Sequence, residues 1–198
     1  MSDIEEISQL ILRERQARDQ GWWDRMADYY HADSLIEVSW FKGTGAEFIE
    51  QSRKTANGGR PPGTHRLSPP AVHLNGDRAF AEVPMALEQR LRVDGVAADL
   101  VAAVRVLYRI RRAKTDWKIQ ATVCVYGRDT LTAVVPGTTI DIDEEKLNRY
   151  REPYRFLAYC LTKDGHTVTD DLYGDDEPER IAQLYQAAFD WLQEKEGR

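Results

Sequence analysis

Asp19 and His65 are of types that transfer protons as a pair, and each lies in a short polar segment. Asp19 opens the segment Asp19–Met26 between two helical patterns, and His65 lies in Thr64–Leu67, after a loop rich in glycine and proline. An imidazole titrates near neutral pH, and a neighbouring carboxylate orients the ring and stabilises its protonated form. If the fold brings the two together, the pair predicts general-base chemistry without a cofactor.

Each residue also has an ordinary structural interpretation. Aspartate is common at helix ends, where it caps the backbone or faces solvent, and a strand histidine can simply be hydrogen-bonded. The pair by itself therefore leaves both interpretations open. The four histidines have no ligand spacing, so the sequence predicts no metal site; they are His31, His65, His73 and His166.

Hydrophobic periodicity predicts the elements that must position this pair. Apolar residues recur at helical spacing over 3–20, 22–31 and 46–55. Helices followed by an antiparallel meander indicate an α+β fold, in which a curved sheet wraps on the N-terminal helices as a cone with an open mouth. Strands are predicted at 35–41, 64–67, 71–74, 79–91, 100–110 and 117–126, with turns at Asn75–Asp77 and Asp94–Gly95.

The sequence changes in character near residue 128. Residues 1–128 are predicted to form the cone, and residues 129–198 a largely helical extension packed on the same domain. The extension contains an aromatic run, Tyr150–Tyr159. This run has two interpretations, a lid over the mouth of the cone or a packing and subunit contact.

Composition excludes several functional classes. The chain has 198 residues and a formal net charge of −6, whereas a nucleic-acid surface needs a basic stripe. It has no apolar run of membrane-spanning length and no secretory signal pattern, so we expect a cytoplasmic protein. In that compartment the two distant cysteines, Cys124 and Cys160, are expected to be free thiols.

Three groups of motifs resemble one known superfamily. They are Asp19–Met26 running on through 29–34, then Thr64–Leu67 with Gly76–Ala79, and finally Asp116–Ile119. The pattern resembles the nuclear-transport-factor-2-like superfamily, in its SnoaL-like branch of scytalone dehydratase, bile-acid 7α-dehydratase and hexachlorocyclohexane dehydrochlorinase relatives. The resemblance covers residues 1–128 and implies the cone fold.

The resemblance also implies a site. Asp19 matches the cavity aspartate of the family and His65 its cavity histidine, which makes His65 the general base and Asp19 its orienting partner. No cofactor is implied, and oligomeric relatives imply a homodimer or homotrimer. Two positions depart from the pattern. Gln89 stands where the dehydratases have a second histidine, and Arg18 stands where scytalone dehydratase has a tyrosine, so the substrate is expected to differ.

Further residues are candidates for substrate contacts. Gln89 has the inward parity of its strand and can hydrogen-bond a substrate oxygen, and Tyr108 and Tyr126 can supply hydroxyls. Arg105 either anchors an anion or carbonyl group in the cavity or pairs with an acid on the exposed sheet face. Three others either line the cavity or belong to the ordinary core, namely Tyr30, Trp40 and Met85.

The sequence thus predicts a cofactor-independent lyase acting on a small aromatic or alicyclic hydroxylated molecule. The expected reaction is an elimination, with dehydration first and loss of halide or of formaldehyde as alternatives. An isomerase or cyclase in the same cavity is a second hypothesis. A non-catalytic binding or interaction module is a third, because this fold serves many functions.

Overall fold

The N-terminal helices begin and end where local chemistry dictates. In the computed structural model, which describes residues 2–58 and 63–194, α1 (Asp3–Gln20) starts with a capping box between Ser2 and Glu5. It ends at Gly21, whose positive φ of 68° suits a residue without a side chain. A short helix, α2 (Trp23–Ala27), follows and contacts α3 (Gly45–Asn57).

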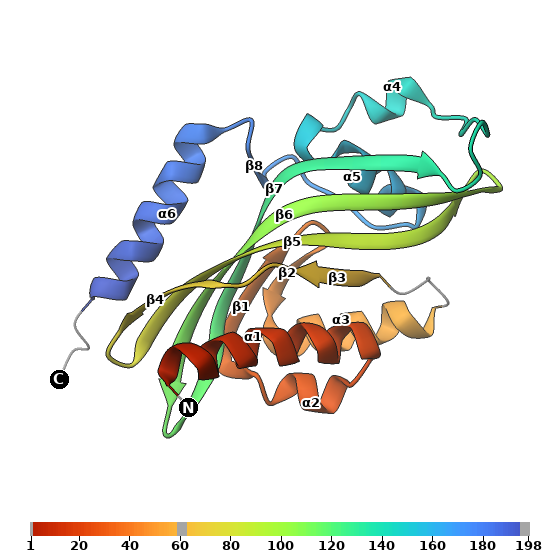
Figure 1. The fold of residues 1–198 in the computed structure, drawn as a ribbon. Coiled ribbons are helices and arrows are strands. Elements are labelled where there is room, and N and C mark those ends of the chain that lie inside the picture. Colours follow the sequence, from red (N-terminus) through yellow and green to blue (C-terminus); the bar gives the residue numbers. More distant parts are fainter. Residues whose placement is uncertain (1, 59–62, 195–198) are drawn as a thin grey trace.

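Eight strands form one strongly curved sheet (Figure 1). Their order is β2-β1-β7-β6-β5-β3, with β4 also paired to β5 and β8 to β7. The β1–β7 and β7–β8 pairs are parallel and the others antiparallel. The strands are β1 (Tyr30–Val38), β2 (Phe41–Thr44), β3 (Thr64–Leu67), β4 (Ala71–Asn75), β5 (Arg78–Val93), β6 (Val96–Ala113), β7 (Asp116–Ala133) and β8 (Tyr173–Gly174).

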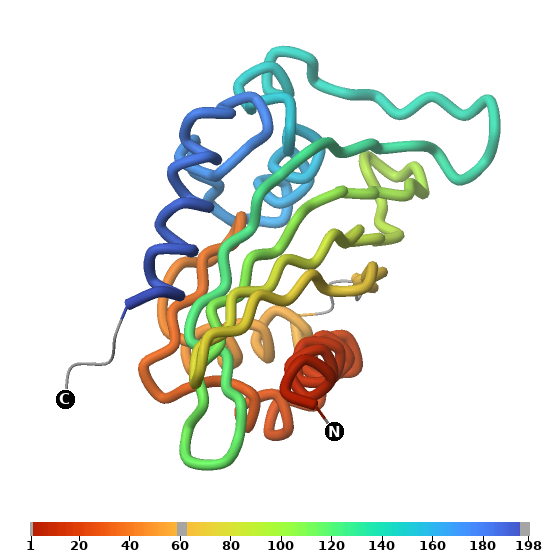
Figure 2. Tube along the Cα trace, turned by 60° about the vertical axis from the view of Figure 1, so that its left-hand side comes forward, coloured from red at the N-terminus to blue at the C-terminus, as the bar shows by residue number. Residues whose placement is uncertain are grey.

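Both faces of the sheet are covered (Figure 2). The inner face packs on α1 and α3 through a core that includes Ile7, Ile11 and Phe48. The outer face carries Phe80 and Leu107, which pack with residues of α6 (Pro178–Gln193). Successive strand residues point to opposite faces, so this alternation decides which residues meet the N-terminal helices and which meet α6.

The extension packs on the same sheet through a second cluster, in which Leu157 and Leu161 pack with Leu100 and Tyr126. Its helical elements before α6 are α4 (Glu144–Leu147), the 3₁₀ turn η1 (Glu152–Tyr154) and α5 (Arg155–Lys163).

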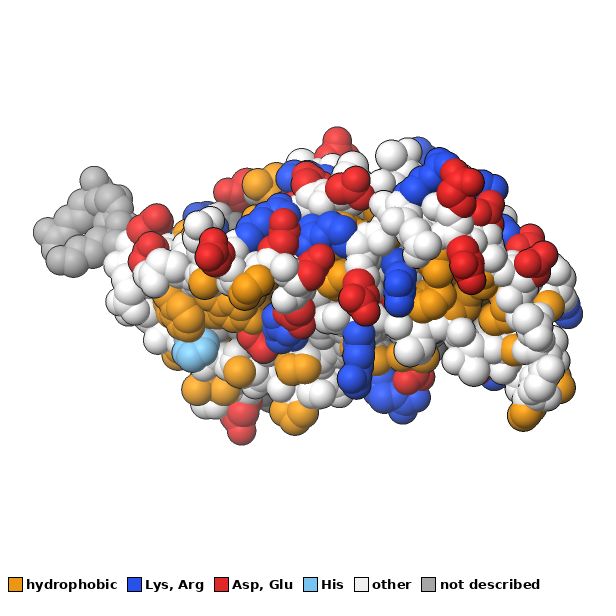
Figure 3. Space-filling model, turned by 90° about the horizontal axis from the view of Figure 1, so that it is seen from above, with side chains coloured by type: hydrophobic (Ala, Val, Ile, Leu, Met, Phe, Trp, Pro, Cys, Tyr) orange, Lys and Arg blue, Asp and Glu red, His pale blue; other side chains and the backbone are white. Residues whose placement is uncertain are grey.

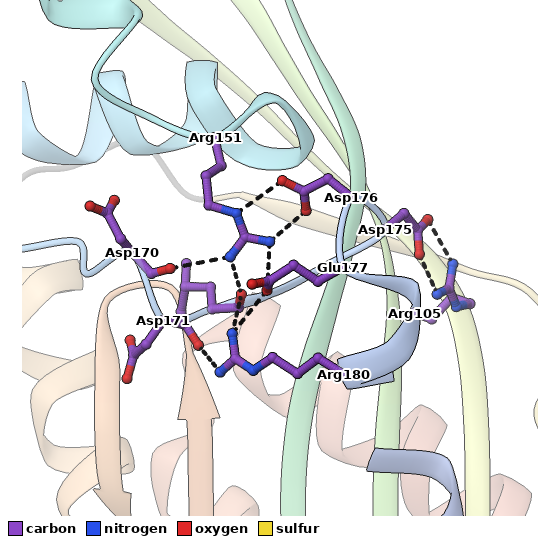
Figure 4. Close-up of polar contacts among 9 residues, drawn as sticks. Arg105, Arg151, Asp170, Asp171, Asp175, Asp176, Glu177 and Arg180 are labelled. Atoms are coloured by element: carbon purple, nitrogen blue, oxygen red, sulfur yellow. Dashed lines mark hydrogen bonds and ion pairs between the residues drawn. The ribbon is translucent and has the colours of Figure 1, made fainter. Parts of the chain in front are cut away.

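Arginine–carboxylate pairs fasten the segment that leads into α6 (Figure 4). Arg151 donates to both carboxylate oxygens of Asp176, at 2.9 and 2.5 Å, and lies 2.7 Å from Glu177. Arg180 pairs with Glu177 at 3.0 Å. These planar, bidentate contacts fix the approach of α6 to the outer face.

The α+β cone is as predicted, but several boundaries differ. The second helix ends at Ala27 rather than at residue 31, because β1 begins at Tyr30 and pairs with β7 there. A hairpin strand, β2, occupies the region just before the third helix. The predicted boundary at 128 falls inside β7, which continues to Ala133 because β6 pairs with it that far.

The described surface carries charges of both signs. On the face shown in Figure 3, Lys and Arg side chains are interspersed with Asp and Glu, and hydrophobic side chains lie between them. This mixture differs from the one-sided basic face typical of nucleic-acid-binding proteins.

Substitution of Phe80 tests how α6 is held on the outer face of the sheet. Its ring is 1% exposed and makes edge contacts with Tyr185 and Phe189, at centroid distances of 6.2 and 5.2 Å. Phe80→Ala should lower the free energy of unfolding by about 3–5 kcal/mol, because it leaves a cavity between sheet and helix. Phe189→Ala, at a position 36% exposed, should cost less in the same denaturant titration. Equal losses would contradict this packing.

Candidate functional site

Asp19 and His65 are in direct contact. Asp19 lies in the last turn of α1, and its Oδ1 is 2.5 Å from Nδ1 of His65. Its Oδ2 accepts the backbone N–H of His65 at 2.8 Å. An ionised carboxylate can only accept, so Nδ1 carries the ring proton and Nε2 keeps a lone pair. This is the tautomer of a general base.

The surroundings favour an ionised Asp19 and a neutral His65. Burial acts to raise the pKa of Asp19, but the hydrogen bonds and charge of His65 bring that pKa below its usual value. Burial lowers the pKa of His65 below 6.5, the Asp19 hydrogen bond opposes this, and the charges of Arg15 and Arg18 add to it. The imidazole can therefore accept a proton at neutral pH.

A cavity of about 430 Å³ adjoins the pair, a volume within the range of small-molecule sites. The N-terminal helices and the first hairpin supply three aromatic rings together with charged and small residues, and the long strands supply mainly aliphatic residues with a few polar ones. Its lining includes Arg15, Arg18, Trp23, Trp40, Phe48, Met85, Leu87, Gln89, Val104, Val106, Thr122, Cys124 and Tyr126.

Of the predicted substrate contacts, the structure places Trp40, Met85 and Gln89 on the cavity wall. Met85 and Gln89 share the inner face of β5, two pleats apart. Trp40 follows β1 and packs with Phe48 of α3, with ring centroids 5.4 Å apart. These residues belong to the same cavity as Asp19 and His65.

Two predicted tyrosines lie elsewhere. The hydroxyl of Tyr30 donates to Glu14 at 2.6 Å, and that carboxylate also pairs with Arg15. Tyr108 is 0% exposed in the core below the cavity, so its hydroxyl is absent from the lining. Of the two interpretations of Tyr30, the structure supports the ordinary core, and the prediction that Tyr108 supplies a hydroxyl to the cavity is wrong because this side chain is buried in the same core.

Arg105 is a second correction. It donates to both carboxylate oxygens of Asp175, at 3.0 and 2.6 Å, on the outer face of the sheet (Figure 4). It shares strand parity with Leu107, which faces α6, whereas Val104 and Val106 face the cavity. Of the two interpretations of Arg105, the structure supports pairing with an acid on the outer sheet face.

The extension forms part of the wall of this cavity. Leu157 and Leu161 of α5 line it together with His166 from the following loop. The ring of His166 lies 5.8 Å from that of Trp40. Asp129 of β7 secures α5 by accepting the backbone N–H of Leu157 at 2.7 Å, and burial raises the pKa of this carboxyl to about 6. The extension is thus both packed and part of the site.

Thr122 and Cys124 were not predicted to line the cavity, whereas Tyr126 was. The alternation of β7 places all three on one face, and this period-two signal was available in the sequence. The hydroxyl oxygen of Tyr126 accepts the backbone N–H of Ser39 at 2.7 Å, which holds this side chain against the end of β1. His166 had no such signal, since only tertiary folding brings its loop to the cavity.

Cys124 and Cys160 are not joined in a disulfide, in agreement with the prediction. Among the described residues, 2–58 and 63–194, no group of three or more His, Cys, Asp or Glu side chains is arranged to hold a metal ion. Nor does this part of the chain contain a helix long and apolar enough to cross a membrane.

The sequence profile described as a SnoaL-like domain matches residues 1–123, more than half of the chain. The chain belongs to the SnoaL-like domain family. The match ends inside β7, so the extension lies outside it. The Asp19–His65 pair lies wholly within the matched part.

Relatives of this SnoaL-like chain occur in fungi. Uncharacterized protein AN9274 of Emericella nidulans is 29% identical over 94% of this chain and 89% of its own length. Pea pathogenicity protein 2 of Fusarium vanettenii is 24% identical over 89% of this chain and 79% of its own length. Both alignments therefore include most of the extension as well as the cone.

Solved structures share the fold. A hexachlorocyclohexane dehydrochlorinase, LinA type 2, superposes with a TM-score of 0.59 at 14% identity, covering 70% of this chain and 94% of that one. A putative scytalone dehydratase from Novosphingobium aromaticivorans gives 0.57 at 12% identity, covering 69% and 95%. At these identities the likeness shows the cone architecture alone.

The electrostatics of the pair can be tested by NMR titration of the His65 ring. We expect a pKa below 6.5, and a further fall in Asp19→Asn, because the carboxylate supports the protonated ring. Asp28→Asn, which changes an exposed aspartate, should leave the pKa unchanged. A pKa that rises in Asp19→Asn would contradict the described geometry.

Proposed function

We propose that this protein is a cofactor-independent lyase that eliminates a small group from an aromatic or alicyclic hydroxylated substrate, with dehydration as the first reaction to test. The observation that carries the proposal is the contact between Asp19 and His65 at the wall of a roofed, largely apolar cavity. Such a cavity suits a compact organic substrate and excludes bulk water from the reaction.

In the proposed mechanism, Nε2 of His65 removes a proton from a substrate C–H, and the electron pair of that bond forms the new double bond. The leaving hydroxide takes this proton from the imidazolium of His65 as it departs, which forms water and returns His65 to its neutral state. Asp19 stabilises the imidazolium that forms, through its bond to Nδ1–H at 2.5 Å. Gln89, on the wall, can hydrogen-bond a substrate oxygen but cannot carry the proton.

Other eliminations need the same base. Loss of halide differs only in the leaving group, and loss of formaldehyde begins with the proton of a hydroxyl group. An isomerase or cyclase would move the proton without expelling a group, so the product mass distinguishes it from a lyase. A pure binding module requires no contact between Asp19 and His65, which makes it a weaker fit to the observed pair.

The proposal can be tested on a panel of hydroxylated aromatic and alicyclic compounds, with loss of water or formaldehyde followed by mass spectrometry. His65→Gln should lower kcat by about 10²–10⁴-fold, the usual contribution of a positioned base. The control is His73→Gln, because His73 is an exposed histidine on β4 and should be dispensable.

The pH profile gives a second readout. The active base is neutral His65, so kcat/KM should fall as the pH falls through a pKa below 6.5. A profile without this limb, or full activity in His65→Gln, would exclude His65 as the base.

A further inference from the structure

Arg18 is a cation in the cavity without an anionic partner. It precedes Asp19 in the last turn of α1, and its side chain lines the cavity. Within the described part of the chain, no carboxylate forms an ion pair with its guanidinium. Asp19 is not available, because one of its oxygens accepts the backbone N–H of His65 and the other contacts the ring.

Other arginines of this chain, by contrast, are paired with carboxylates. Arg15, one turn earlier on α1, is paired with the buried carboxylate of Glu14. On the outer face, Arg105 and Arg151 each hold an aspartate with two bonds (Figure 4). A guanidinium is planar and presents paired N–H donors that match a carboxylate. Within residues 2–58 and 63–194, no such contact with a carboxylate is seen for Arg18, which lines the cavity.

Three aromatic rings hold the Arg18 guanidinium in place. Its central carbon lies 5.6 Å from the ring of Trp23, 5.9 Å from Trp40 and 5.8 Å from Phe48. Cation–π contacts at this range stabilise the charge but do not use its in-plane donors. The arrangement therefore combines a fixed cation with flat apolar surfaces in one corner of the cavity.

The position of this cation is electrostatically costly. Burial and the charge of Arg15 lower the pKa of Arg18 to about 10, so it is still protonated at neutral pH. The same two arginines hold down the pKa of His65. A buried charge without a partner is destabilising, and an anion supplied by a ligand would remove that penalty.

We propose that Arg18 binds the carboxylate of the substrate, and that the cavity selects planar ring acids over the corresponding neutral molecules. The inference rests on the proposed function in using the same cavity, and it adds the substrate class. The ring would lie among Trp23, Trp40 and Phe48, with its carboxylate on the guanidinium. The bound anion would also offset the effect of the Arg18 charge on His65. The pKa of His65 would rise, and His65 would become a stronger base.

The test compares 2-naphthoate with 2-naphthamide, which has the same shape without the charge. Binding to the full chain is measured by calorimetry, and tryptophan fluorescence provides a second signal because Trp23 and Trp40 flank the site. The native protein should bind naphthoate at least about tenfold more tightly, as expected for a charge-assisted bidentate contact.

Variants assign that preference to one residue. Arg18→Gln should abolish it, and Arg18→Lys, which keeps the charge without the planar fork, should retain part of it. Arg13→Gln is the matched control, because Arg13 is an exposed arginine on the same helix. Circular dichroism and thermal melting verify that each variant is folded.

The pKa of His65 provides a further measurement. It would not respond to the bound anion if Arg18 had only a structural role. Naphthoate, but not naphthamide, should raise the NMR-measured pKa of His65 in the native protein, and Arg18→Gln should weaken this response. Equal affinity for the two probes, no binding of naphthoate, or an unchanged preference in Arg18→Gln would overturn the inference.

The test of the anion site can be distinguished from the test of the proposed reaction. His65→Gln should keep the preference for naphthoate even though the base is removed. A charge preference together with no elimination activity would reject the lyase and keep the anion site. Elimination from neutral compounds only, without a charge preference, would reject the anion site and keep the lyase.

Discussion

The carboxylate of Asp19 is the interaction on which the rest of the site depends. It accepts the backbone N–H of His65 and the Nδ1–H of the His65 ring. These two bonds join the end of α1 to the edge strand β3. The backbone contact fixes where β3 lies relative to the helix. The ring contact fixes which nitrogen of the imidazole is protonated. One side chain thus sets both the shape of the cavity mouth and the chemical state of its base.

The neighbouring residues of α1 complete this arrangement. Arg15 and Arg18 lie one turn or less from Asp19, so a helix places all three at the cavity. Arg15 is neutralised by Glu14, whereas Arg18 is held only by aromatic rings. Burial lowers the pKa of His65, and the charges of both cations add to this effect. The extension then roofs the cavity through α5, while α6 covers the opposite face of the sheet.

The sequence indicated the fold and the central pair because those features leave local signals. Helical and period-two patterns marked α1, α3 and the long strands, and the motifs around Asp19 and His65 carried the family resemblance. It was harder to predict how deeply a side chain is buried and to which face of the sheet it points. Alternation grouped Arg105 with Leu107 but could not tell which face was inner, and it could not show that Tyr108 lies below the cavity. His166 arrives through tertiary packing, which no local pattern encodes.

The central claim is that Asp19 holds His65 as a neutral base with Nε2 free toward the cavity. The most direct measurement is the ¹⁵N chemical shift of both ring nitrogens at neutral pH, in protein labelled at histidine. The account predicts a protonated Nδ1 and an unprotonated Nε2 for His65. A proton on Nε2, or a doubly protonated ring at neutral pH, would contradict it.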